Sequence, residues 1–266
     1  MKNPRFLLFA FLLISVVSMF SCKKTDDPGI GHLTFKFQHK VDGDSMIIHQ
    51  MKYVNAIGNQ YEVTEVEWFL SDITLYRKND APVVIAKTGD VIYGIHYVDT
   101  KIKSTFSWSP DFEIPEGDYD SISFVFGIDE QKNKSGIFRD FPESAMFWPD
   151  IMGGGYHYMK FNGFYKDTNN VRTAFNYHLG IGQIYSTDTT FVQNYFTVTL
   201  KNSSFNLGDG KTKEIQIIMN LEEWFTNPIF DFHVWGGQIM DKQDAMAIGC
   251  RNGKHVFAIG YIKDVQ

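Results

Sequence analysis

Apolar and polar side chains alternate along much of this chain, a pattern typical of strands with one buried face. Between residues 33 and 41 every second position is apolar, and His39 occupies one of these positions. The same period of two returns between Ile122 and Ile128. Both stretches predict half-buried strands, and His39 is expected to point into the core.

Other segments rich in Val, Ile, Tyr and Trp are bounded by turn sequences such as Thr88-Gly89-Asp90. Further strands are predicted at 46–54, 61–77, 83–87, 91–98, 156–165, 171–179, 190–200, 213–221 and 255–262, and short helical pieces at 222–225 and 241–248. Many short strands without alternating long helices predict an all-β fold, a single antiparallel β-sandwich-like domain.

The first residues differ from the rest. Lys2 and Arg5 precede an apolar run over 6–17 that is shorter than the roughly 20 residues of a membrane-spanning helix. The run leads to Ser21-Cys22, which favours a bacterial lipoprotein signal peptide over 1–21 with a lipid on Cys22. A plain secretory signal with an unrelated cysteine is the alternative.

The predicted lipoprotein organisation places a flexible tether at 22–31 and the β domain at 32–266. One lipid anchor holds a protein at a membrane surface without spanning it. We therefore expect a lipid-anchored protein of the bacterial cell envelope, at the outer membrane and facing the periplasm or the cell surface.

Composition indicates a large core and argues against nucleic acid as a partner. Of the 266 residues 44% are hydrophobic and 16% are aromatic, while the formal net charge is −6. An acidic chain has no electrostatic basis for holding a phosphate backbone, so nucleic acid is not an expected partner. With Cys22 lipidated, Cys250 is the other cysteine, and a single thiol cannot form an intramolecular disulfide.

Common catalytic motifs are missing from the sequence. It contains no G-x-S-x-G elbow, phosphate-binding glycine loop, H-E-x-x-H or paired C-x-x-C. Glu62, Glu65 and Glu67 fall on strand-like sequence, where a spacing of two residues can place two of them on a solvated face, and we expect them to be solvated. We therefore expect that the protein is not an enzyme.

Several histidines are candidate metal ligands, because neutral imidazole binds copper and zinc. His157 is in phase with Met159 and Phe161, and His96 is in phase with Val98. For any one of them a hydrogen-bonded structural histidine is the alternative, and the metal interpretation requires several to converge.

His178 and an aromatic segment complete the candidates. In a regular strand His178 lies opposite Tyr177 and Leu179, unless the glycine at position 180 marks a bulge that redirects it. The segment 146–156 places Phe147 and Trp148 before three glycines, which predicts a loop with an aromatic plug into the core.

Short segments also occur in a characteristic order. They are FQHKVDG (37–43), EWFLSDITL (67–75), GDY (117–119), FVFGID (124–129), MFW (146–148), GY (155–156) and HLG (178–180). In this order and combination they resemble the MbnP family of periplasmic or surface copper-binding proteins, which are associated with copper acquisition.

This resemblance implies an all-β fold and a mononuclear copper site built from histidines. In some members a tryptophan oxidised to kynurenine joins the site, and that oxidation is attributed to a partner di-haem protein of the MbnH type, related to haem peroxidases. By motif position Trp148 is the candidate for the modified tryptophan, and His39 and His178 are the candidate copper ligands. His157 and His96 are reserve ligands.

Two positions depart from the family pattern. Lys134 follows Asn133 where copper-acquisition members tend to carry Asn-His, and Pro149-Asp150-Ile151 replaces a common second tryptophan. A lysine ammonium cannot ligate copper. The expected function is copper binding or handling at the envelope, and the alternative is a metal-free binding module that uses aromatic-rich loops to hold a glycan, peptide or partner.

Overall fold

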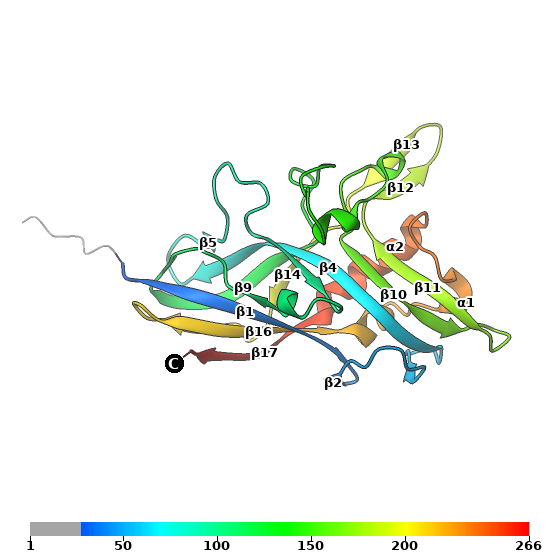
Figure 1. The fold of residues 1–266 in the computed structure, drawn as a ribbon, viewed down its shortest axis with the longest axis horizontal. Helices are drawn as coiled ribbons and strands as arrows, with labels where there is room; N and C mark the ends of the chain where they lie inside the picture. Colours follow the sequence, from blue (N-terminus) through cyan, green and yellow to red (C-terminus); the bar gives the residue numbers. More distant parts are fainter. Residues whose placement is uncertain (1–27, 266) are drawn as a thin grey trace, which may run out of the picture.

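Two β-sheets face each other in the computed structural model, which describes residues 28–265 (Figure 1). The first sheet has the order β17 (Phe257–Asp264), β16 (Thr212–Asn220), β1 (Ile30–Val41) and β2 (Asp44–Ser45), with β7 (Ser107–Trp108) and β8 (Ile114–Pro115) also paired to β1. Strand β1 is therefore the hub of this sheet.

The second sheet is built around the long strand β4. Its order is β11 (Arg172–Leu179), β10 (Met159–Lys166), β4 (Gln60–Arg77), β9 (Gly117–Phe126) and β14 (Phe196–Leu200). Short strands extend it: β3 (Tyr53–Val54), β5 (Val83–Val84) and β6 (Ile95–Asp99) on β4, and β15 (Phe205–Leu207) on β9. A separate hairpin consists of β12 (Gly182–Tyr185) and β13 (Thr189–Val192).

Helices are short. They are η1 (Lys103–Phe106), η2 (Glu143–Met146), η3 (Asp150–Met152), η4 (Leu221–Phe225), α1 (Phe232–Trp235) and α2 (Gln243–Val256). Within residues 28–265 none of them is both long and apolar enough to cross a membrane.

The core lies between the sheets and is mainly aromatic. Trp68 of β4 packs edge-on against Phe37 of β1, with 5.7 Å between ring centroids, and lies 5.3 Å from Phe257 of β17. Phe126 of β9 stacks on Phe196 of β14. Burying each such side chain stabilises the fold by about 1.5–3 kcal/mol. The contacts of Trp68 join the two sheets, whereas the Phe126–Phe196 stack lies within the second sheet. The two facing sheets confirm the predicted all-β, sandwich-like fold.

Three local features differ from the prediction. Strand β1 runs parallel to β16, so the sandwich is not wholly antiparallel. The segment 46–54 is largely irregular and enters a strand only at β3, because His49 has a positive φ of 60° that interrupts extended backbone. Helix α2 continues to Val256, well past the predicted end at 248, because buried residues recur along one side of it.

The amino-terminal features fall largely outside the described residues. The predicted signal peptide and Cys22 lie within 1–27, before the described range. Strand β1 begins at Ile30, paired with Pro115, two residues before the expected domain boundary at 32. The last residues of the predicted tether are thus part of a sheet.

A long connection between β9 and β10, residues 127–158, carries η2 and η3. We call it the β9–β10 segment. Figure 1 shows this green segment and the β12–β13 hairpin projecting on the same side of the molecule. The space beside Gly153 is filled by Ile181 and Phe191, which shows that segment and hairpin are in contact.

Candidate functional site

The outer face of strands β10 and β11 carries polar side chains. Lys160 pairs with His178 on β11, and Asn162 pairs with Asn176. Directly paired residues share a face. His178 therefore lies on the face opposite buried Tyr177, as regular alternation predicts, and no bulge redirects it.

The β9–β10 segment folds back over this outer face. Lys160 donates from Nζ to the carbonyl oxygen of Ala145 at 2.6 Å. The backbone N–H of His157 donates to the carbonyl oxygen of Met146 at 2.7 Å. The polar side chains on this face of β10 and β11 predict exposure to solvent, but the β9–β10 segment covers the face.

His157 lies against His178. It precedes β10, which begins at Met159, so the phase argument that groups it with Met159 and Phe161 does not apply. Its ring is buried, with its centroid 5.1 Å from that of His178 and the two planes at 82°. Two of the four candidate ligand histidines are therefore neighbours.

Trp148 is the third member of this group. Its ring centroid is 4.6 Å from that of His157, and its Nε1–H donates to the carbonyl oxygen of Met152 at 3.1 Å. A Cβ at Gly180 would lie 2.5 Å from the indole, so the glycine allows the ring to pack there. Trp148 is fully buried and is the aromatic plug that the sequence predicts.

Hydrogen bonds fix one nitrogen of each imidazole. Nδ1 of His157 lies 2.9 Å from the Met146 carbonyl oxygen, which can only accept, so Nδ1 carries the proton and Nε2 the lone pair. Nε2 of His178 lies 2.7 Å from Oδ1 of Asn162 and donates to it. Nδ1 of His178 then holds a lone pair, and it is buried without a hydrogen-bond partner among the described residues.

Both imidazoles are held in the neutral form. Burial lowers the pKa of His157 to about 4. It lowers the pKa of His178 to about 3, with smaller contributions from nearby His157 and Lys160. Neutral imidazole is the form that binds metal ions. The pair therefore presents two uncharged nitrogen ligands at neutral pH.

His39 lies elsewhere, in the core between the sheets, with the inward orientation that its sequence position predicts. Nε1–H of Trp68 donates to its Nε2 at 3.0 Å, and the Phe106 ring is 5.2 Å away. Because the lone pair on Nε2 accepts this bond, Nδ1 of the neutral ring carries the proton. In this arrangement His39 has no free lone pair.

His96 is also separate from the pair. Its half-buried ring stacks between Phe37 at 5.1 Å and Trp108 at 5.0 Å. Nε2 lies 2.8 Å from the carbonyl oxygen of Thr105 and donates to it. Burial lowers its pKa to about 4. These contacts belong to the packing of β1, β6 and β7.

Glutamates on β4 are less exposed than the sequence predicts. Glu62 and Glu67 are buried, because Arg172 pairs with Glu62 and the hydroxyl of Tyr97 donates to Glu67 at 2.6 Å. Carboxylate oxygens of Glu65, Glu67 and Asp99 lie within 4.8 Å of one another. Among the described residues this is the one group of three side chains of metal-binding types that lie so close together. The Lys101 ammonium already contacts Glu65. The expected solvated face is thus wrong for Glu62 and Glu67.

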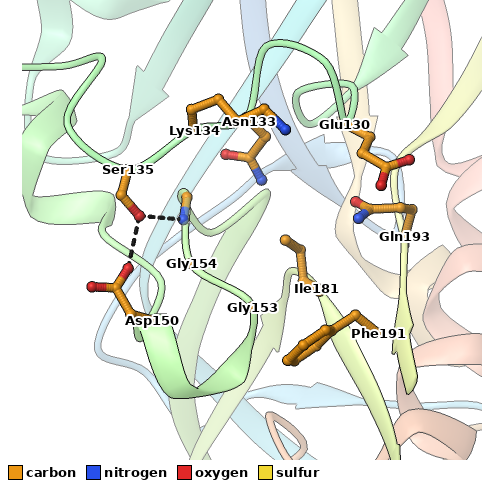
Figure 2. A pocket seen from close by; sticks show the side chains of 11 residues that line it. Glu130, Asn133, Lys134, Ser135, Asp150, Gly153, Gly154, Ile181, Phe191 and Gln193 are labelled. Carbon is orange, nitrogen blue, oxygen red and sulfur yellow. Dashed lines mark hydrogen bonds between the residues drawn. The ribbon is translucent and has the colours of Figure 1, made fainter. Parts of the chain in front are cut away.

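A cavity of about 340 Å³ opens beside the glycine run 153–155 (Figure 2). Ser135 donates to Asp150 at 2.8 Å and accepts from the backbone N–H of Gly155 at 2.9 Å.

Neighbouring positions 133 and 134 have different environments. Lys134 lines this cavity with an exposed side chain, whereas buried Asn133 accepts from the backbone N–H of Tyr156 at 2.8 Å. Asn133 thus supports the turn that leads to His157.

Sequence reasoning does not single out Asn162 or Met146, although both orient the histidine pair. Asn162 on β10 contacts His178, which lies diagonally from it on neighbouring β11, and Met146 contacts His157 through its backbone carbonyl. The alternation of Lys160 and Asn162 with buried neighbours places them on the outer face, but partner strands come only from the fold.

Comparison with known proteins agrees with this architecture. A family model described as MbnP matches residues 30–241. Among solved structures, MbnP from Methylosinus trichosporium is similar, with a TM-score of 0.51 and 13% identity over 77% of this chain and 80% of that chain. At this identity the similarity supports the fold alone. No curated protein matches.

Proposed function

Because the chain belongs to the MbnP family, which its match over residues 30–241 shows, we propose that it binds copper through His157 and His178. The observation that carries this proposal is the pair of rings 5.1 Å apart, in which one nitrogen of each ring is hydrogen-bonded and the other holds a lone pair. Imidazole nitrogen suits copper.

The donor set fits a metal ion. Nδ1 of His178 is a buried lone pair without a partner among the described residues, and leaving such a group unsatisfied costs about 1–3 kcal/mol. A copper ion would satisfy it. Among the described residues His157 and His178 are not part of any group of three His, Cys, Asp or Glu ligand atoms that lie within 4.8 Å of one another. The proposed site therefore uses two protein nitrogens and leaves other positions to exogenous ligands.

Trp148 is the proposed modification site. Its family position and its contact with His157 at 4.6 Å support this assignment. We expect a di-haem partner of the MbnH type to oxidise it to kynurenine in the cell. Peptide mass spectrometry of Trp148 in protein isolated from its native envelope tests this proposal. Lipidation of Cys22 would keep the protein at that envelope.

Elemental mass spectrometry of protein purified from the native envelope tests copper binding. We expect about one copper per chain, and loss of copper in His157→Gln and His178→Asn. His255→Ala changes an exposed histidine and is the matched control, which should keep its copper. Loss in His39→Ala with retention in the two pair variants would instead assign the site to His39.

A metal-free binding module is the second candidate function. Phe141 is 82% exposed, Ile151 is 89% exposed and Tyr185 is 66% exposed, and all lie on the β9–β10 segment or the β12–β13 hairpin. These are the apolar side chains with which the loops would hold a glycan, peptide or partner. Background copper in the wild-type protein and in every variant would favour this function.

A further inference from the structure

Asn162 makes the hydrogen bond that defines the chemistry of His178. It lies on β10, diagonally across from His178 on β11, and its Oδ1 is 2.7 Å from Nε2 of the imidazole. An amide oxygen only accepts, so it requires a proton on Nε2. If the amide were reversed, its NH₂ group would require the opposite tautomer.

Glu65 determines which way this amide faces. It lies directly opposite Asn162 on β4, and its Oε2 accepts from Nδ2 of Asn162 at 3.4 Å. A carboxylate only accepts, so the NH₂ group faces Glu65 and the oxygen faces His178. The ammonium of Lys101 contacts Oε1 of the same carboxylate and holds it in place.

We propose that Asn162, oriented by Glu65, is a positioning residue that holds His178 as the Nε2–H tautomer and so makes Nδ1 its metal-binding nitrogen. This inference rests on the proposed function only for the identity of the ligand that Nδ1 meets. His157, whose Nδ1 donates to Met146, presents Nε2 instead. The two histidines would therefore bind through different nitrogens.

Nuclear magnetic resonance of the metal-free protein tests the tautomer directly. With ¹⁵N-labelled histidine, we expect a protonated Nε2, an unprotonated Nδ1 and a resolved Nε2–H proton resonance for His178 at neutral pH. In Asn162→Leu this proton should lose its acceptor, so its resonance should shift or exchange away. A protonated Nδ1 in the wild-type protein, or an unchanged resonance in Asn162→Leu, would overturn the inference.

Asn176→Leu is the matched control. Asn176 is paired with Asn162 on the same face, and none of the described residues hydrogen-bonds its side chain. It should leave the His178 resonance unchanged. The double variant Glu65→Gln with Asn162→Asp reverses donor and acceptor between the two residues and should restore the Nε2–H resonance.

Copper titration separates this inference from the proposed function. Loss of such a supporting group typically lowers metal affinity 10–100-fold, so Asn162→Leu should bind copper that much more weakly than Asn176→Leu. If the wild-type protein binds no copper but the resonance still depends on Asn162, the proposed function fails and the positioning role stands. If wild type binds copper and Asn162→Leu binds it equally well, the positioning role fails.

Discussion

His39 couples stability to pH through its burial in the core. Its pKa is lowered from 6.5 to about 3, so between these pH values the unfolded chain binds a proton that the folded chain does not. The contribution of His39 to the free energy of unfolding is therefore fully present above pH 6.5. It decreases as pH falls toward 3, by about 1.4 kcal/mol for each pH unit in that range. We expect urea unfolding between pH 7 and 4 to show a steeper decrease for wild type than for His39→Gln. Equal slopes would contradict this prediction.

Individual residues differ in how far the sequence predicts them. The inward position of His39 follows from alternation alone, because β1 is regular over its whole length. The large rings before three glycines predict an aromatic plug, but not that Trp148 is the buried ring while Phe147 is 44% exposed. The proximity of His157 to His178 does not follow, because it depends on a segment that folds over the outer face of another pair of strands.

The β9–β10 segment is the element that assembles the candidate site, and Asn133 anchors it. Its Oδ1 accepts from the backbone N–H of Tyr156, next to His157. Removing this acceptor leaves a buried donor unsatisfied, at a cost of about 1–3 kcal/mol. Asn133→Ala should therefore increase amide hydrogen exchange across 146–157 and weaken copper binding. Lys134→Ala alters the adjacent exposed side chain and should change neither; equal exchange in both variants would refute the anchoring role.

Strands are predictable where apolar and polar residues alternate regularly, but the strands with which they pair are not. The long strand β4 lies where β-rich composition places it, and β9 overlaps the predicted alternation over 122–126 but begins earlier, at Gly117. The parallel pairing of β1 with β16 joins segments from opposite ends of the domain, and no local pattern encodes it. Burial of Glu62 likewise depends on Arg172 of β11, which local sequence does not place beside it.

In the whole molecule, the histidine pair of the candidate site lies apart from the core between the sheets. Trp68 and Phe257 join the sheets in the interior, whereas His157 and His178 lie outside the second sheet under the β9–β10 segment. The aromatic plug and the core are therefore expected to fold without metal. The resemblance to MbnP anticipates this architecture, while the folding of the β9–β10 segment over the outer face of β10 and β11 determines which histidines meet.

This separation makes a prediction about ligand-linked stability. Copper that binds the folded chain alone raises its unfolding free energy by RT ln(1 + [Cu]/Kd), about 2.7 kcal/mol at a hundredfold excess over Kd. Copper should thus raise the Tm of wild type and leave that of the His157→Gln/His178→Asn double variant unchanged. Without metal, the double variant should still unfold cooperatively, because neither substitution enters the core between the sheets. An equal rise in Tm for both proteins would place the copper elsewhere, with the cluster of Glu65, Glu67 and Asp99 as the first site to test.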